Sequence, residues 1–244
     1  MEEKHINTDN IKTSEASAQD ESKEQKAINQ SKIPKYNIYI LLLALFGLTY
    51  IFTLFIGNIL YTPFTVVGGS MQPTLNQNVE DSDEHAKNDI VYISKQTNYD
   101  YDDVVVFWAE ADQNYLIKRI VAVPGDTISY KIDRFADING RSYLYYSILI
   151  NGQMLENSHS FEDMYIQIAD FSTYELYQDI INNKSTTLND NEYFCLGDNR
   201  NNSFDSRFLG PVRYDDVLGK VHFVTHYGEG ILKAYIRSWF TNEI

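Results

Sequence analysis

The most informative part of this sequence is Gly-Asp-Asn-Arg-Asn-Asn-Ser-Phe-Asp-Ser-Arg, which runs from Gly197 to Arg207. It places acidic side chains, arginines and serine hydroxyls within one short polar run. Three interpretations of such a run are open: a polar surface loop, a calcium-binding loop, or a hydrogen-bonded network that fixes a neighbouring strand. Arginines among the candidate ligands argue against calcium, which is held by oxygen ligands.

Two segments upstream of this run offer a candidate nucleophile and a candidate general base. Gly68-Gly69 directly precedes Ser70 and Pro73 follows it, so the backbone there can form a tight loop that presents a hydroxyl. Lys118 lies within the otherwise apolar strand predicted for Tyr115–Val123. Burial lowers the pKa of a lysine, and a neutral amine can act as a general base. The alternatives are an ordinary turn serine and a lysine that is paired at the strand edge.

The histidines are poorer candidates for the base, and they are His5, His85, His159, His222 and His226. His5 falls in the polar N-terminal tail, and the next two fall in an acidic loop and in an irregular region. His222 and His226 share a face of one predicted strand, but neither has an acidic partner or a nucleophile motif attached to it. A Ser-His-Asp triad is therefore a poor fit.

A single apolar, uncharged run extends from Ile38 to Leu60 and is long enough to cross a bilayer about 30 Å thick as a helix. A cleaved signal peptide is the alternative, but no small-residue cleavage site follows the run. Lysines precede the run and acids follow it, which predicts a cytoplasmic N-terminus. We expect a disordered tail over residues 1–35, a transmembrane helix over 36–61 and an extracytoplasmic catalytic domain over 62–244.

The remainder of the chain alternates short β-branched and aromatic runs with turn signals such as Asn139-Gly140. This pattern predicts a mainly β domain of antiparallel strands. Residues 133–191 are less regular and are expected to form an inserted cap, which could contain a helix within Phe161–Ile181. Apolar residues at helical spacing from Ile231 onward predict an amphipathic helix packed on the domain, with a membrane-surface role as the alternative.

Composition excludes some other classes of protein. The net charge is -14, and the 20 basic side chains are scattered among 34 acidic ones. Nucleic-acid binding normally needs a basic patch, so this balance argues against a nucleic-acid partner. The single cysteine, Cys195, excludes an intrachain disulfide, and its neighbours indicate a buried strand.

In this combination and order, the motifs resemble those of bacterial type I signal peptidases (leader peptidases), in particular the Gram-positive kind with one anchor. The resemblance spans most of residues 38–225 and is weak over 133–191. It implies the fold of the serine-lysine proteases, an antiparallel β-sheet domain. In the Ser-Met-x-Pro-Thr motif it implies that Ser70 is the nucleophile, and in the Lys-Arg…Pro-Gly-Asp motif that Lys118 is the base. The serine of the Gly-Asp-Asn-Arg-x-x-Ser motif, here Ser203, would orient that lysine.

The resemblance also implies a supporting structure around these residues. Two ion pairs are expected, Asp198 with Arg119 and Asp205 with Arg207. Gly68 replaces a serine that completes the oxyanion hole in some relatives, which leaves the backbone N–H of the nucleophile as the clearest donor. Apolar pockets for the small residues of a signal peptide are implied as well, with the candidates Val66, Met71, Leu75, Leu116 and Ile117.

The implied activity is that of a membrane-bound serine endopeptidase, which removes signal peptides from exported preproteins through an acyl-enzyme formed by a Ser-Lys dyad. Neither a metal nor an organic cofactor is expected. The expected partners are signal peptides and the lipid bilayer, and a monomer near the secretion translocon is expected, with its catalytic domain outside the bacterial cell membrane. The rival functions are an inactive assembly factor, which would lack the serine or the lysine, a Ser-Lys protease with a regulatory substrate, and an extracellular binding module.

Overall fold

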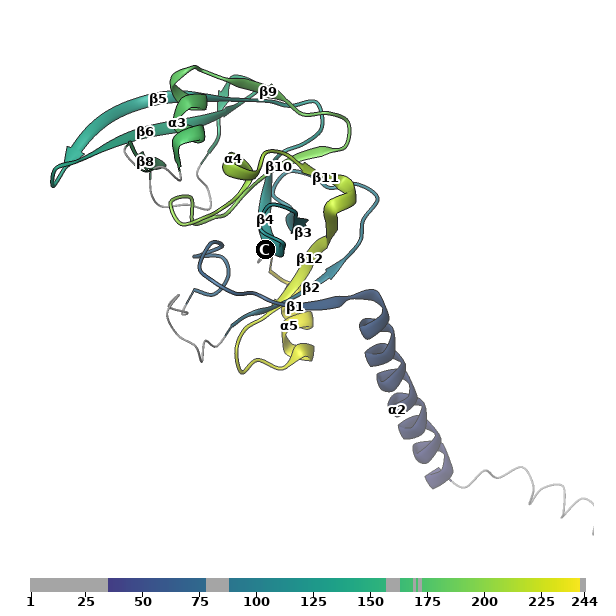
Figure 1. Cartoon of the computed structure of the whole chain (residues 1–244). Coiled ribbons are helices and arrows are strands. Elements are labelled where there is room, and N and C mark those ends of the chain that lie inside the picture. The colour runs from purple at the N-terminus through teal and green to yellow at the C-terminus, as the bar shows by residue number, and fades with distance from the viewer. Residues whose placement is uncertain (1–34, 78–87, 157–162, 169, 171–172, 242–244) are drawn as a thin grey trace, which may run out of the picture. The chain divides into compact units, whose positions relative to one another are not determined.

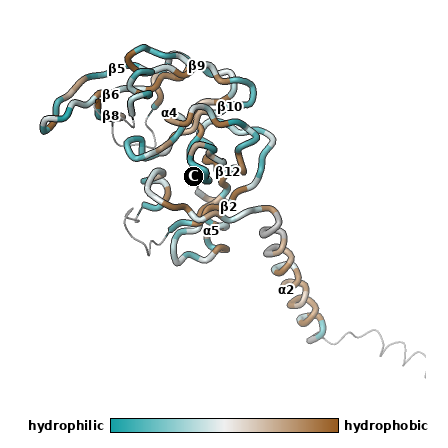
Figure 2. Tube along the Cα trace, in the orientation of Figure 1, coloured by the Kyte–Doolittle hydropathy of each residue, from teal (hydrophilic) through white to brown (hydrophobic). Residues whose placement is uncertain are grey.

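The computed structural model describes residues 35–77, 88–156, 163–168, 170 and 173–241, and it divides into two compact units, residues 1–58 and 59–244. Helix α2 (Lys35–Leu60) contains the predicted apolar run. Figure 2 shows hydrophobic residues along most of this helix, and described side chains such as Leu41 and Phe46 are exposed. Within the described residues, no helix qualifies as a membrane span by its length and hydropathy.

The second unit is built on two sheets (Figure 1), and their strands are antiparallel, as the sequence predicts. The larger sheet has seven strands in the order β1-β2-β12-β3-β4-β10-β11, so β1 lies at one edge. Its strands are β1 (Thr62–Thr65), β2 (Ile90–Ser94), β3 (Val104–Ala109), β4 (Asn114–Ala122), β10 (Glu192–Leu196), β11 (Val212–Arg213) and β12 (Val217–Thr225).

The smaller sheet has five strands, in the order β7-β6-β5-β9 with β8 paired to β6. They are β5 (Thr127–Ile138), β6 (Arg141–Ile150), β7 (Gln153–Met154), β8 (Tyr165–Gln167) and β9 (Ser185–Thr187). β5 and β6 therefore extend into the region of residues 133–191. Much of the region predicted to be less regular is a second sheet, because β5 and β6 form one long hairpin across its start.

The described part of this unit also contains four short helices: α3 (Tyr174–Ile181), α4 (Ser206–Leu209), the 3-10 helix η2 (Tyr214–Asp216) and α5 (Ile231–Ser238). Helix α3 lies where the sequence allows a helix, and α5 confirms the C-terminal helix. The helix packs on β12 as expected, with Ala234 buried, the Tyr235 ring against Phe223 and Arg237 donating to the Val224 carbonyl oxygen, although Ile231, Leu232 and Ile236 are exposed.

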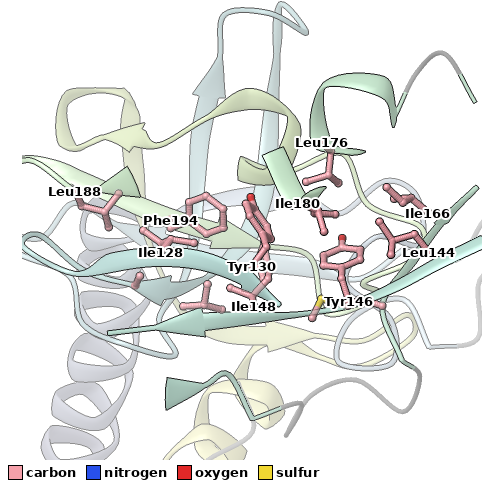
Figure 3. Close-up of a cluster of buried hydrophobic side chains, with 14 residues drawn as sticks. Ile128, Tyr130, Leu144, Tyr146, Ile148, Ile166, Leu176, Ile180, Leu188 and Phe194 are labelled. Atoms are coloured by element: carbon pink, nitrogen blue, oxygen red, sulfur yellow. The ribbon is translucent and has the colours of Figure 1, made fainter. Parts of the chain in front are cut away.

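The two sheets share a hydrophobic core (Figure 3). Leu176 and Ile180 of α3 lie in one buried cluster with Ile128 of the smaller sheet and Phe194 of β10 in the larger one. Burying such side chains supplies most of the favourable free energy of folding. Cys195, beside Phe194, is fully buried in a second cluster, which confirms the prediction for the lone thiol.

This core predicts a contrast between two neighbouring isoleucines of α3. Ile180 is 2% exposed and Ile181 is 38% exposed. Ile180→Ala should lower the free energy of unfolding by about 2–5 kcal/mol, since it removes buried methyl groups and leaves a cavity. Ile181→Ala should change it by less than about 1 kcal/mol. Urea unfolding of the purified variants measures both, and equal losses would mean that α3 is not anchored through this cluster.

Candidate active site

Ser70 lies on a tight loop that follows β1. The loop begins at Gly68, whose φ of 81° lies in the left-handed region that glycine adopts without strain. Two hydrogen bonds from Asn199 hold this backbone: its N–H donates to the Ser70 carbonyl oxygen at 3.0 Å, and its Nδ2 donates to the Gly69 carbonyl oxygen at 3.2 Å. The run that opens at Gly197 therefore fixes the loop that carries Ser70.

Lys118 reaches Ser70 from the neighbouring strand β4. Its Nζ lies 2.8 Å from Ser70 Oγ and also donates to the Ile117 carbonyl oxygen at 2.9 Å. The side chain is only 2% exposed. Burial lowers the pKa of Lys118 below its usual range, and the negative charge of Asp205 offsets this shift only in part. A neutral amine at hydrogen-bond distance from a hydroxyl can remove its proton.

Arg119 and Asp198 form a buried, bidentate ion pair next to Lys118. Arg119 Nε and Nη2 donate to the two carboxylate oxygens of Asp198, each at 2.9 Å. Thr74 Oγ1 donates to the same carboxylate at 2.6 Å, so the pair also holds the far end of the Ser70 loop. Removing two charges from water is costly, and the bidentate geometry with its additional hydrogen bond offsets that cost.

Asp205 and Arg207 form the second bidentate pair. Arg207 Nε and Nη2 each donate to Asp205 at 2.8 Å, and Nη1 donates to Tyr146 Oη at 3.0 Å. Asp205 also accepts from the Gly197 backbone N–H at 3.0 Å. Burial opposes the charge of Asp205, but the adjacent guanidinium outweighs it and holds the pKa of this carboxyl below its usual range. The pair therefore joins the Gly197–Arg207 run to β6 of the smaller sheet.

Ser203, the predicted orienting residue, does not contact Lys118 by a hydrogen bond. Within the described residues, its buried Oγ has no hydrogen-bond partner. Ser203 lies against Gly197, where an added Cβ would come within 2.5 Å of the Ser70 carbonyl oxygen and closer still to the Ser203 side chain. Only glycine fits this close approach. The orienting role of Ser203 stays a prediction.

A cleft of about 320 Å³ opens beside Ser70 and Lys118. Of the predicted pocket residues, Val66, Leu116 and Ile117 line it, whereas Met71 and Leu75 do not. Those two side chains are fully buried in the hydrophobic cluster that includes Val66. The remaining lining residues are Phe64, Thr65, Val67, Val91, Val106, Asn114 and Tyr115. A larger cavity of about 700 Å³, over α3 and α4, includes neither Ser70 nor Lys118.

The histidines do not join the site. His222 Nε2 lies 2.8 Å from Ser94 Oγ, and His226 Nδ1 lies 2.9 Å from Asp89 Oδ1. The expectation that His226 lacks an acidic partner is therefore wrong, because the fold brings Asp89, directly before β2, next to it. The other three histidines lie outside the described residues. Among the residues that the structure covers, no three or more His, Cys, Asp or Glu side chains could together hold a metal ion.

The site also uses residues that the sequence analysis did not single out. Thr74, Asn199 and Tyr146 hydrogen-bond to the loop or to the ion pairs, as described above. Thr74 and Asn199 lie inside the quoted motifs, so their position was a signal that could have identified them. Nothing in the sequence marks Tyr146, which is one of several tyrosines along β6.

The Arg119–Asp198 pair predicts a large effect of neutralising Asp198. Asp198→Asn should lower the free energy of unfolding by about 3–5 kcal/mol, because Arg119 would remain buried without a counterion. The matched control is Asp216→Asn, which breaks the exposed Arg213–Asp216 pair and should cost less than about 1 kcal/mol. Chemical denaturation measures both. A small loss for Asp198→Asn would mean that this ion pair does not stabilise the fold.

The sequence of this chain is similar to those of known proteins. The family model described as signal peptidase, peptidase S26, matches residues 36–226. Signal peptidase IB of Staphylococcus aureus is 34% identical over 182 residues, which cover 72% of this chain and 84% of that protein. Signal peptidase I P of Bacillus subtilis subsp. natto is 29% identical over 171 residues, which cover 67% and 76% of the two chains.

A solved structure is also similar in sequence. The crystal structure of a signal peptidase I from Enterococcus faecalis V583 is 24% identical, with a TM-score of 0.34, and the match covers 51% of this chain and 97% of that one. The family model alone spans well over half of the chain. The chain therefore belongs to the signal peptidase family, peptidase S26, and within it to the type I signal peptidases, which are serine endopeptidases.

Proposed function

We propose that this protein removes N-terminal signal peptides from exported preproteins by means of a Ser70–Lys118 dyad. One observation carries the proposal: the 2.8 Å separation of Lys118 Nζ and Ser70 Oγ, with the lysine almost completely buried. A lysine in water is protonated at neutral pH and cannot accept a proton. Desolvation favours the neutral amine and so supports the role of general base.

In the acylation step, Lys118 takes the proton from Ser70 Oγ, and the oxygen attacks the carbonyl carbon of the scissile peptide bond. The negative charge that develops on the carbonyl oxygen needs a hydrogen-bond donor. The Ser70 backbone N–H is the candidate, since it donates to no backbone carbonyl within the described residues. Protonated Lys118 then gives its proton to the leaving amine, and an ester joins Ser70 to the signal peptide.

In the deacylation step, neutral Lys118 takes a proton from a water molecule, which attacks the ester carbonyl carbon. The bond to Ser70 Oγ breaks, and the oxygen recovers a proton from Lys118. The signal peptide leaves with a free carboxylate and the dyad is restored. The same amine thus serves as base and acid in both steps, and no other titratable group is required at Ser70.

The substrate would lie in the cleft beside Ser70 in an extended conformation. The cleft is lined mainly by apolar side chains such as Val66, Leu116 and Ile117, which suits the small apolar residues before a signal-peptide cleavage site. β1 is an edge strand that leads into this cleft, and edge strands can pair with an added peptide through their free backbone groups.

We include a membrane anchor in the proposal, with the tail over residues 1–35, the anchor over 36–61 and the catalytic domain over 62–244. Support comes from the 26 residues of α2, which as a helix extend about 39 Å at 1.5 Å per residue. Its exposed apolar side chains need an apolar environment. Basic residues precede the helix and acidic ones follow it, which favours an N-terminus in the cytoplasm.

Conservative replacement of the base should abolish catalysis. Lys118→Arg keeps a long cationic side chain, but a guanidinium cannot become neutral, so cleavage of a secretory precursor should fall about a thousandfold or more. Ser70→Ala should be equally inactive. Lys131→Arg, on the exposed part of β5, is the matched control and should retain full activity. Appreciable cleavage by Lys118→Arg would remove this lysine from the role of base.

The anchor predicts how the full chain behaves in cells. It should remain with the membrane pellet after a carbonate wash, because α2 is expected to be embedded in the bilayer. Protease added outside intact cell membranes should digest residues 62–244 and spare a tag at the N-terminus. Release by the carbonate wash would contradict the anchor, and digestion of the tag with protection of the domain would reverse the proposed orientation.

A further inference from the structure

Asn76 is a buried residue that the mechanism above does not use. It is 1% exposed, and its φ of 55° lies in the left-handed region, which asparagine tolerates better than most residues. Its Nδ2 donates two hydrogen bonds, to the Val66 carbonyl oxygen at 2.8 Å and to the Gly68 carbonyl oxygen at 3.1 Å. Both acceptors lie on the segment that connects β1 to Ser70.

Asp89 holds Asn76 in place from the other side. Asn76 Oδ1 accepts from the Asp89 backbone N–H, and the Asn76 backbone N–H donates to Asp89 Oδ2, each at 2.8 Å. The Asp89 carbonyl oxygen also accepts from the Val66 N–H at 2.9 Å. The second carboxylate oxygen of Asp89 contacts His226 Nδ1 at 2.9 Å. Every polar atom of the Asn76 amide group is thus used, and its orientation is fixed.

The residue between the two Asn76 acceptors faces the substrate cleft. Val67 is 78% exposed and lines the cleft together with Ser70. Within the described residues, the backbone N–H and C=O of Val67 make no hydrogen bond. The carbonyl groups on either side of Val67 are turned to the buried Asn76, so the free backbone groups in this segment are concentrated at Val67. An extended peptide needs such free groups to pair with an edge strand.

We propose that Asn76 is a positioning residue for the substrate: it holds the Val66–Gly68 backbone so that Val67 can pair with the extended precursor. The proposal rests on the proposed function, because it assumes that the precursor occupies the cleft beside Ser70. Asn76 does not touch the reacting atoms. Its loss should therefore weaken precursor binding more than it slows the chemical step.

The test is single-turnover cleavage of a secretory precursor by the full chain in lipid vesicles, with the maximal rate and the half-saturating precursor concentration measured separately. Asn76→Gly keeps the left-handed backbone and removes both donors. The half-saturating concentration should rise about tenfold, as expected when the two hydrogen bonds to the Val66–Gly68 backbone and the one from the Asp89 N–H are lost, while the maximal rate changes less than about threefold. Each variant is assayed below its own unfolding temperature.

The matched control is Asn139→Gly. Asn139 also has a left-handed backbone, with a φ of 51°, but it is exposed at the tip of the β5–β6 hairpin. Its replacement should leave both kinetic quantities unchanged. A second variant, Asn76→Asp, preserves the size of the side chain and the acceptor for the Asp89 N–H but loses both donors. It should raise the half-saturating concentration at least as much as Asn76→Gly, whether or not the glycine variant folds.

Two outcomes would overturn the proposal. An unchanged half-saturating concentration in a folded Asn76 variant would reduce Asn76 to a structural role, even if the variant is less stable. A fall in the maximal rate alone would mean that Asn76 positions the Ser70 loop and does not contribute to precursor binding. If the wild-type chain itself leaves the precursor intact, the proposed function fails, and that result is distinct from either outcome for Asn76.

Discussion

The carboxylate of Asp198 is the point on which the site depends, because it joins three segments that are far apart in the sequence. It pairs with Arg119 on β4, accepts a hydrogen bond from Thr74 on the Ser70 loop, and belongs itself to the Gly197–Arg207 run. Lys118 precedes Arg119 on the same strand, so the two side chains point to opposite faces of the sheet. Fixing Arg119 therefore also fixes the direction of the Lys118 side chain. The pair is fully buried and therefore little screened by salt.

Burial has opposite consequences for the two kinds of cation in this region. The buried guanidinium groups of Arg119 and Arg207 each have a bidentate carboxylate partner. Lys118 has a hydroxyl and a carbonyl oxygen as its hydrogen-bond partners, so desolvation lowers its pKa. Asp205 is close enough to oppose this shift, but its charge is already engaged by Arg207. The carboxylates of Asp198 and Asp205 are thus paired with Arg119 and Arg207. Neither forms an ion pair with Lys118 that would hold the lysine in its charged form.

Local sequence patterns predicted the features that are determined by residues close together in the chain. The alternation of apolar residues predicted an antiparallel β fold, and a lysine within an apolar strand singled out Lys118. The patterns could not predict contacts between distant strands. The packing of distant segments decides three such features: the pairing of His226 with Asp89, the hydrogen bonds of the Asn76 amide, and the burial of Met71. The division of the strands into two separate sheets was not predicted, because pairing between strands decides it and local alternation does not.

The role of Lys118 as a neutral base can be tested by the pH dependence of single-turnover cleavage of a precursor at saturating concentration. In the proposed mechanism the neutral form of Lys118 is the base, so the rate should rise with pH as its ammonium loses a proton. Because burial lowers the pKa, the rise should level off below the usual lysine value of 10.5. A rate that is flat between about pH 6 and 9, or that rises only near the usual lysine value, would contradict a buried lysine as the base.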